Sequence, residues 1–287
     1  CQSEVAINLL LERARASRLM SFACCGKKLP SEPDELKATE WVKPEATAMS
    51  SSRVLKTVVF MGSARNVTPP WGGDSRLGDR VIKHVLATLE SRSTAFKNET
   101  TVEGNTMTHE ESVTHEVTCY DPLEVFGKGG AMEGDGHMEA PEFFLKSDDP
   151  RKAKMAEMLA TIKAADAYVI VTCEYNHTVP PALASMMGHF GGSNYAHKPS
   201  AIVTYSVSPW GGARTSIALQ PMLHELGCLP VSKMTCYPTA GELFNEDGTP
   251  KDPEHRMLKQ LPAMLTDLEW VATAFARMRG SLGPPKF

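Results

Sequence analysis

The sequence has few cysteines, no long hydrophobic run and no excess of basic residues. Its seven cysteines are odd in number and show no paired C-x-x-C spacing, which excludes a zinc ribbon and favours a reducing compartment. Polar residues break every apolar run within about eight residues, whereas a membrane-spanning helix needs roughly 18. The 30 basic and 34 acidic residues give a net charge of -4, so nucleic acid is not expected as the main partner.

Several motifs of nucleotide binding and nucleophilic catalysis are also absent. The chain has no G-x-x-x-x-G-K-[ST] and no G-x-G-x-x-G placed after a strand, so neither a nucleoside triphosphate site nor a Rossmann dinucleotide site is predicted. Ser63 lacks the G-x-S-x-G setting of a nucleophile. Cys173 follows a predicted strand as in cysteine-dependent phosphatases, but Val179 stands where those enzymes need arginine.

Apolar β-branched runs alternate with helix-period segments from Val54 onward, as in successive βα units around a parallel sheet. Hydrophobic residues make up 42% of the 287 residues, enough for the core of one domain with extensions. Five strands are predicted, at residues 54–60, 113–119, 167–172, 200–205 and 229–235. Amphipathic helices are predicted at residues 77–89, 155–162, 183–190, 217–226 and 258–275.

This alternation predicts an α/β fold, a flavodoxin-like three-layer sandwich. Its five-stranded parallel sheet is expected to have the order 2-1-3-4-5, with helices on both faces, because right-handed crossovers place them there. Asp149 is the expected N-cap of the second helix, with Pro150 in its first turn.

Two parts of the chain are expected to lie outside this framework. Residues 1–48 form a flexible or loosely docked extension before a domain at residues 49–287; the basic first 31 residues weakly resemble an organelle transit peptide. We expect a cytoplasmic protein, or an organellar one if residues 1–48 contain such a peptide. The polar segments 91–112 and 127–140 lack periodicity and apolar anchors, so they are predicted to be surface loops.

A group of possible metal ligands lies in or beside the first polar segment. It consists of His109, Glu110, Glu111 and His115. Nothing in their spacing fixes them on one face, so they are predicted to be solvated loop residues, and no metal site is expected.

Ligands of open α/β sheets bind beyond the carboxyl ends of the strands, near the point where the strand order reverses. The loop after Phe60 offers the hydroxyl of Ser63 and the guanidinium groups of Arg65 and Arg76, followed by a helix N-terminus. Together these groups suit a phosphate dianion. An ordinary strand-to-helix turn is the alternative.

The loops after the third and fourth predicted strands suit a flat ligand. Glu174, Tyr175, Asn176 and His177 are polar or aromatic and come directly after a buried strand. In the loop from Ser206 to Gly212, the paired glycines allow close backbone approach to a ring edge, and an aromatic side chain can cover an apolar face.

The three loops together resemble those of NAD(P)H-dependent FMN reductases and their quinone-reducing relatives. The motifs are G-S-x-R after the first strand, T-x-E-Y-N-H-[ST]-x-P after the third and S-x-x-x-x-G-G-x-R after the fourth, and the likeness spans residues 54–240. It implies FMN as cofactor, NADPH or NADH as electron donor, and a quinone, free flavin or other small oxidant as acceptor. It also implies a homodimer or homotetramer, with residues 180–190 as a candidate contact.

The resemblance assigns residues to the cofactor. The phosphate would lie at Ser63, Arg65 and the region Arg76 to Gly78, and the ring would contact the two later loops. The expected cofactor-binding residues are Ser63, Arg65, Ser75, Arg76, Gly78, Cys173, Glu174, Tyr175, Asn176, Ser206, Pro209, Trp210, Gly211 and Gly212.

Two departures from the family pattern leave alternatives open. Residues 66–74 resemble an insertion, so either Ser75 or Arg76 completes the phosphate site. Cys173 stands where the family usually has proline, and is either redox-active or packed beside the ligand. His177 either donates a proton to a quinone oxygen or orients its loop, and no other catalytic side chain is expected.

Other functions fit the same framework. A flavodoxin-type electron carrier would use the same sheet and cofactor without being an enzyme, and a scaffold without cofactor would keep only the fold. Relatives that reduce organoarsenicals, chromate or ferric complexes share the expected architecture, so the acceptor stays open.

Overall fold

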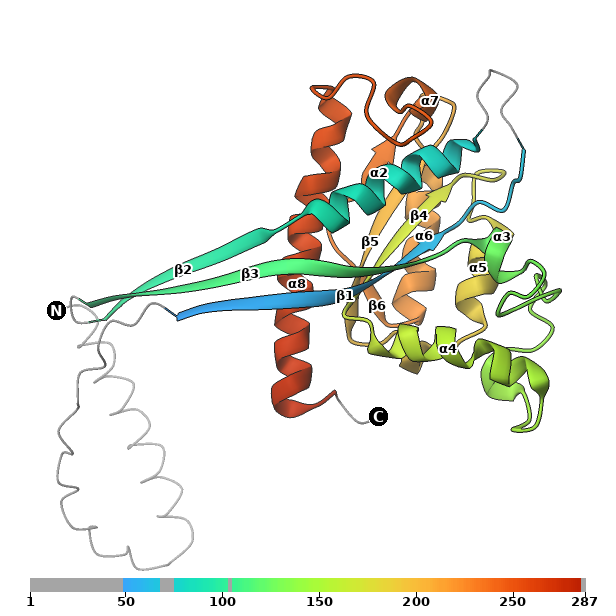
Figure 1. The fold of residues 1–287 in the computed structure, drawn as a ribbon, viewed down its shortest axis with the longest axis horizontal. Coiled ribbons are helices and arrows are strands. Elements are labelled where there is room, and N and C mark those ends of the chain that lie inside the picture. Colours follow the sequence, from blue (N-terminus) through green and yellow to red (C-terminus); the bar gives the residue numbers. More distant parts are fainter. Residues whose placement is uncertain (1–48, 68–74, 103–104, 285–287) are drawn as a thin grey trace, which may run out of the picture. The chain divides into compact units, whose positions relative to one another are not determined.

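The computed structural model describes residues 49–67, 75–102 and 105–284 (Figure 1). The strands are β1 (Met49–Met61), β2 (Thr94–Val102), β3 (Asn105–Tyr120), β4 (Ala167–Cys173), β5 (Lys198–Tyr205), β6 (Cys228–Pro230) and β7 (Thr235–Tyr237). The helices are α2 (Leu77–Ser91), α3 (Pro122–Val125), α4 (Pro150–Ala164), α5 (Pro181–Gly188), α6 (Ala213–Glu225), α7 (Ala240–Leu243) and α8 (Gln260–Leu282). The expected extension at residues 1–48 lies outside the described residues.

The sheet confirms the predicted order of the core strands. Its order is β2-β3-β1-β4-β5-β6, and all pairs except β2 with β3 are parallel. Two details differ from the prediction. The expected fifth strand at residues 229–235 is split into β6 and β7, which both pair with β5. The antiparallel strand β2 adds an edge that was not predicted.

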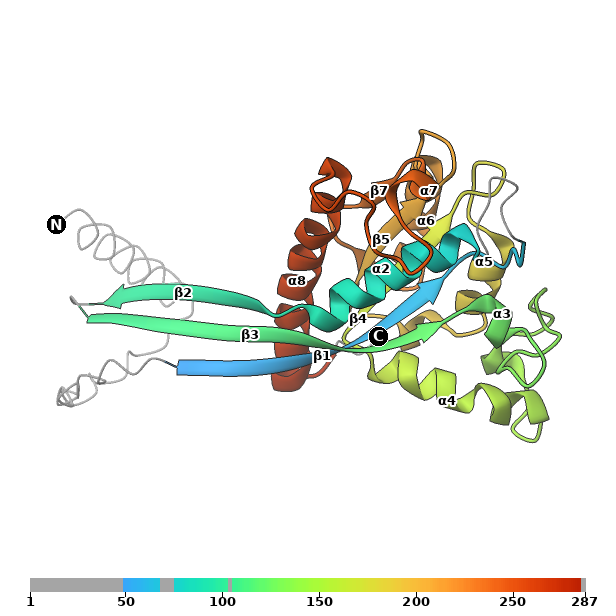
Figure 2. The same ribbon diagram turned by 45° about the horizontal axis from the view of Figure 1, so that its top comes forward.

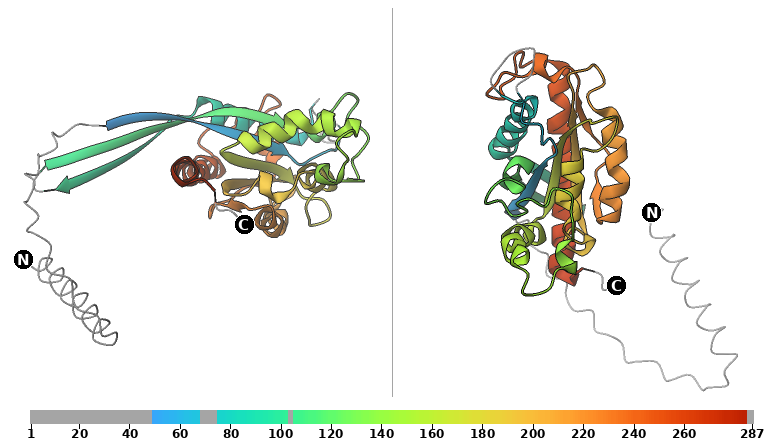
Figure 3. Two further views of the ribbon diagram at one scale, coloured as in Figure 1. Left: turned by 90° about the horizontal axis from the view of Figure 1, so that it is seen from below. Right: turned by 90° about the vertical axis from the view of Figure 1, so that its right-hand side faces the viewer.

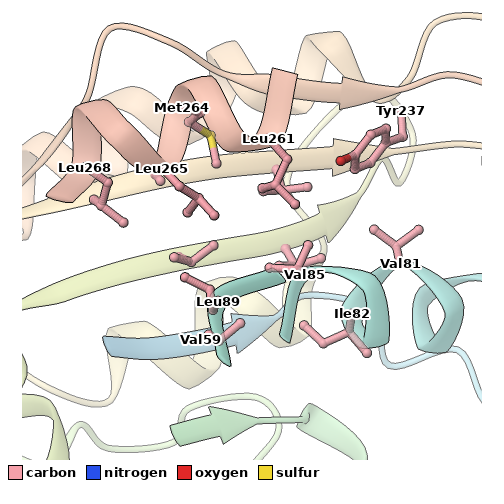
Figure 4. Packing of buried hydrophobic residues seen from close by; sticks show 14 of the residues in the cluster. Val59, Val81, Ile82, Val85, Leu89, Tyr237, Leu261, Met264, Leu265 and Leu268 are labelled. Atoms are coloured by element: carbon pink, nitrogen blue, oxygen red, sulfur yellow. The ribbon is translucent and has the colours of Figure 1, made fainter. Parts of the chain in front are cut away.

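Alternate residues of the central strands point to opposite faces of the sheet, and each face has its own core. Val59 and Val169 belong to the core covered by α2 and α8, whereas Val58 and Ile170 belong to the core covered by α4, α5 and α6. In Figure 4, side chains of α2 and α8 extend toward one another within the first core. The predicted three-layer sandwich is therefore confirmed.

The predicted helices are present, and their ends follow the expected local chemistry. Asp149 caps α4 by accepting a hydrogen bond from the Arg151 N–H at 2.9 Å, with Pro150 in the first turn. Gly227 follows α6 with a φ of 76°, a left-handed conformation that glycine adopts without steric cost.

The apolar side of α5, the candidate subunit contact, lies inside the protomer. Leu183, Met186 and Met187 of this helix are completely buried there. These side chains already have a role in the core, so a subunit contact at α5 stays a prediction.

The segment 91–112 was predicted to be a loop, and this prediction is wrong. It contains the end of α2, all of β2 and the first half of β3, which pair from Thr94 with Val113 to Val102 with Asn105. The hairpin continues the sheet beyond α8, with the first half of β1 alongside (Figures 1 and 2). Residues 97–100 of β2 are exposed on both faces, and a stretch without a buried face carries no apolar alternation, which is why the sequence pattern did not show this strand.

The segment 127–140 consists of turns, as predicted, but it is anchored to the core. Met132 is only 2% exposed and belongs to the core around α4 and α5. Asp135 lies 3.3 Å from the buried ring of His189, Oδ2 to Nε2. The expectation that this segment lacks an apolar anchor is therefore wrong.

Candidate functional site

The carboxyl ends of β1, β4 and β5 lie side by side, and a cleft of about 190 Å³ opens between the loops that follow them. Eight of the expected cofactor-binding residues line it: Ser63, Arg65, Arg76, Gly78, Cys173, Glu174, Tyr175 and Ser206. Four residues that sequence reasoning missed complete the lining: Val67, Leu77, Tyr205 and Val207. Each of these four lies within or next to a loop or helix start that the sequence analysis assigned to the ligand. Their closeness in the chain to those segments could therefore have identified them as lining residues.

The other six expected residues, which include Ser75, lie outside the lining. Asn176 is at the tip of its turn, and Pro209 and Trp210 are exposed, with Trp210 63% exposed. Gly211 and Gly212 are buried, with φ of 60° and 75°. A Cβ atom at Gly212 would lie 3.0 Å from Thr204 Cβ, so this glycine lets the start of α6 pack closely on β5.

Ser63 and Tyr175 connect the first loop to the second. The Ser63 Oγ and Tyr175 Oη atoms are 3.0 Å apart. The Arg65 guanidinium lies over the Tyr175 ring, with its carbon 3.9 Å from the ring centroid, a cation–π contact. Arg65 is exposed, so its charge is available at the mouth of the cleft.

Arg76 is held by two carboxylates. It is the N-cap of α2 and forms ion pairs with Asp79 and Asp121, and its Nη1 donates to the Ser63 carbonyl at 3.2 Å. Burial by itself would lower the pKa of this guanidinium, but the bonds to Asp79 and Asp121 more than offset it and raise the pKa. Much of the charge of Arg76 is thereby balanced within the protein, and the side chain fixes the Ser63 loop against α3.

The start of α2 reaches the cleft because Gly78 has no side chain. A Cβ atom there would lie 2.4 Å from the Tyr205 hydroxyl and 2.5 Å from Met61 Cε. The N–H group of Asp79 donates to the Arg76 carbonyl at 3.0 Å, whereas the N–H groups of Leu77 and Gly78 come before it and have no acceptor within their own helix; such groups bind anions. Beside them, Ser75 Oγ is buried without a hydrogen-bond partner among the described residues. Hydroxyl groups, helix N–H groups and the Arg65 cation therefore fit a phosphate here.

The loop after β4 forms a tight turn. Tyr175 and Thr178 exchange two backbone hydrogen bonds, of 3.1 and 3.0 Å. Between them, Asn176 and His177 have φ of 48° and 66°, the left-handed pair of a type I′ turn. Backbone strain of this kind is concentrated at functional sites. The His177 side chain is 70% exposed, with Nε2 3.9 Å from Glu174 Oε1.

Glu174 connects the second loop to the first turn of α6, which directly follows the third loop. Its Oε1 accepts a hydrogen bond from Arg214 Nη1 at 2.9 Å, and Oε2 accepts one from the Arg214 backbone N–H at 3.3 Å. Arg214 also lies 5.6 Å from the ring of Trp210. This ion pair sets the separation of the two loops that border the cleft.

Cys173 lines the cleft. Burial raises the pKa of its thiol, and this effect outweighs the opposing hydrogen bonds from Ser63 and Tyr205 and the charge of Arg65. Because the thiolate is the reactive form of cysteine, this environment suppresses reactivity. A redox role for Cys173 stays a prediction.

The possible metal ligands of the sequence lie on β3, not in a loop. Within the described residues, no group of three metal-ligating side chains is close enough to hold an ion. The expectation that they are solvated is wrong for two of them. Glu111 is 6% exposed and pairs with Arg53 and Arg277, and the His115 side chain is fully buried against Glu269.

A larger groove of about 760 Å³ lies elsewhere, between α8 and the strands that extend beyond it. Its lining includes Phe96, Asn98, His109, Trp270 and Arg277. It is remote from the carboxyl ends of the parallel strands.

None of the helices in the described part of the chain has the length and hydrophobicity needed to cross a membrane.

Comparison with known proteins points to one family. The sequence model of NADPH-dependent FMN reductases matches residues 55–239. No curated protein sequence matches the chain.

A solved structure shares the fold, and a second was matched with a lower TM-score. FerB from Paracoccus denitrificans, a flavoenzyme NAD(P)H:(acceptor) oxidoreductase, is 17% identical with a TM-score of 0.50, and the match covers 76% of this chain and 98% of FerB. An FMN-dependent NADH-azoreductase from Bacillus anthracis, solved with FMN, is 17% identical with a TM-score of 0.38, covering 78% of this chain and 99% of the azoreductase.

Proposed function

Because the chain belongs to the NADPH-dependent FMN reductase family, we propose that its cleft binds FMN and that the protein transfers electrons from NAD(P)H to a quinone, free flavin or another small oxidant. The match to the family model confirms the resemblance to FMN reductases that the sequence motifs indicated. The observation that carries the proposal is the convergence of the three strand ends on one cleft with hydroxyl groups and a cation at one end.

The phosphate of FMN would lie at the start of α2. Ser63, Arg65 and Ser75 would bind its oxygens, together with the first-turn N–H groups of α2. Arg76 would act indirectly. Its pairs with Asp79 and Asp121 hold the Ser63 loop in place.

The ring would lie between the second and third loops. Glu174, Tyr175 and Ser206 line the cleft, and Asn176 and the backbone of residues 209–212 would lie at the edge of the ring. When bound, FMN supplies the hydride chemistry, and the protein supplies position and electrostatics. Backbone N–H groups of the Glu174–His177 turn would stabilise negative charge on the ring edge.

No side chain of the cleft is placed as a dedicated acid or base. The ring of His177, whose catalytic use is the alternative to an orienting role, is exposed and directed to Glu174. Its contribution would be to the geometry of the turn, which holds Tyr175 under Arg65.

The test uses the full chain. We expect the purified protein to bind FMN and to oxidise NADPH with benzoquinone faster than the same concentration of free FMN does. A rate equal to that of free FMN would exclude the reductase, and bound FMN with no rate increase would indicate an electron carrier. NADH in place of NADPH measures the donor preference, and a series of acceptors measures the oxidant.

A further inference from the structure

Within the described part of the chain, the strand β2 pairs only with β3, so its other edge is open. It is the terminal strand of the sheet, and the hairpin that it forms with β3 runs past α8 away from the rest of the domain (Figure 3). The side chains of Lys97, Asn98, Glu99 and Thr100 are exposed. Open edges present unpaired backbone groups and attract another strand, and proteins usually protect them with charged side chains, proline or bulges. Residues 96–100 contain no proline, and their two charges, Lys97 and Glu99, are of opposite sign.

The sequence of this edge is complementary to itself. When two copies of β2 pair antiparallel about Asn98, Lys97 lies opposite Glu99 of the second copy, and Glu99 lies opposite Lys97. Phe96 then lies opposite Thr100 of the second copy. Opposite charges directly across two strands stabilise the pair, and two-fold symmetry supplies two such contacts.

Neighbouring registers are unfavourable. Pairing about Lys97 would place the two lysines opposite one another, and pairing about Glu99 would do the same for the two glutamates. Like charges directly opposite destabilise a sheet. In a register shifted by one residue, Lys97 would lie opposite Asn98 or Thr100 of the second copy. Both residues are neutral, so both ion pairs would be lost.

The existing contacts of Lys97 extend this pattern. Lys97 Nζ lies 3.1 Å from Glu110 Oε2, its direct neighbour on β3. In the paired arrangement Lys97 would lie between two carboxylates, one from its own β3 and one from the second copy. Glu110, Lys97 and Glu99 of the second copy would then lie side by side across the joined sheets, with charges of alternating sign.

We propose that two copies of this chain associate through antiparallel pairing of their β2 edges, with the two-fold axis at Asn98. The sheet would then continue from one copy into the other. Thr94 adjoins the domain and Val102 is at the far end of the hairpin (Figure 2), so antiparallel pairing would place the two domains at opposite ends. Phe96 and Asn98 line the groove beside α8, so the second copy would extend the floor of that groove.

The first test measures association of the full chain by sedimentation at several concentrations. We expect a dimer that Glu99→Lys or Lys97→Glu weakens about tenfold or more, because each change replaces two attractions with two repulsions. In an equimolar mixture of the two variants, the two lysines on β2 of one chain face the two glutamates on β2 of the other, so we expect the dimer to return. Lys128→Glu, an exposed change in the loop 127–140, is the control for net charge.

The second test measures the register. Asn98→Cys places the two introduced thiols opposite one another at the axis, within the distance of a disulfide, so mild oxidation should link two chains. Thr100→Cys places the thiols four residues apart along paired strands and should not link them efficiently.

The outcomes separate this proposal from others. A chain that is monomeric at all concentrations would overturn it, whether another segment of the chain or nothing covers the β2 edge. A dimer unaffected by the charge changes, or cross-linking equal at positions 98 and 100, would assign the interface to another surface. Flavin binding does not enter either measurement, so failure here leaves the reductase proposal unchanged.

Discussion

The hydroxyl groups of Ser63 and Tyr175, which are 112 positions apart in the sequence, lie 3.0 Å from one another. Each belongs to a loop at the end of a different parallel strand, β1 or β4. With Arg65 stacked on the same tyrosine ring, they form the boundary between the expected phosphate end and the expected ring end of the cleft.

The first prediction concerns Arg65. We expect Arg65→Ala to weaken FMN binding about tenfold to a hundredfold, because a hydrogen bond to a charged group contributes about 1.5–3 kcal/mol. Arg65→Lys should recover part of the loss. Fluorescence titration with FMN and with riboflavin, which lacks the phosphate, gives the measurement. An equal loss for both ligands would place the phosphate elsewhere.

The second prediction concerns the strained turn. His177→Gly should raise the free energy of unfolding by about 0.5–1 kcal/mol, because a left-handed non-glycine residue costs about 1–2 kcal/mol and glycine costs part of that in chain entropy. Asn176→Gly should have a smaller effect, since asparagine tolerates this conformation. Urea denaturation without added flavin measures both. A loss of stability in His177→Gly would mean that the contacts of its ring outweigh the strain.

The third prediction concerns the buried Glu269 on α8. Its Oε1 lies 2.5 Å from Arg92 Nε and 2.9 Å from His115 Nε2, and the side chain is fully buried. Glu269→Gln should lower the free energy of unfolding by about 3–5 kcal/mol, because it leaves a buried cation without its partner. Glu116→Gln, an exposed change on β3, is the matched control.

The effect of Glu269 should depend on pH. Burial alone would raise its pKa, but the hydrogen bonds from His115 and Arg92 prevail and hold the pKa below 4.5. The stabilisation is therefore present above pH 4.5 and is lost as the pH falls through the folded-state pKa. Urea titrations from pH 7 down to pH 4 should show the native chain and Glu269→Gln converging. A constant difference between them would show that the carboxylate is not the source.

The fourth prediction concerns Cys173. Because burial raises the pKa of the Cys173 thiol, its reaction with iodoacetamide at pH 7.5 should be slower than that of a free, fully exposed thiol such as glutathione. Mass spectrometry of the peptide that contains Cys173 gives the rate. A rate above that of glutathione would indicate a stabilised thiolate and support the redox role.

The sequence predicted most of the sheet because buried parallel strands leave a strong signal. The strands at residues 167–172 and 200–205 are almost wholly apolar, since helices cover both of their faces. The strand β2 and the first half of β3 gave no such signal. Residues 97–100 of β2 are exposed on both faces, so they show no apolar alternation, and pairing between strands depends on backbone groups that every residue carries.

The candidate site was likewise predicted only in part from the sequence. The rule that ligands bind beyond parallel strand ends identified the three loops, and eight of the named residues line the cleft. The pairing of Arg76 with Asp121 could not be predicted, because these residues are 45 positions apart. Nor could the sequence show that Gly211 and Gly212 are buried and do not line the cleft.

The order of the amino acids by itself determined the helices, the buried strands and the types of side chain at each strand end, because periodicity and local chemistry are properties of neighbouring residues. The tertiary structure alone decided which charges remain available and which are balanced, and which strand edge stays open. Both depend on distances between segments that are remote in the chain, and electrostatic and packing energies depend on those distances.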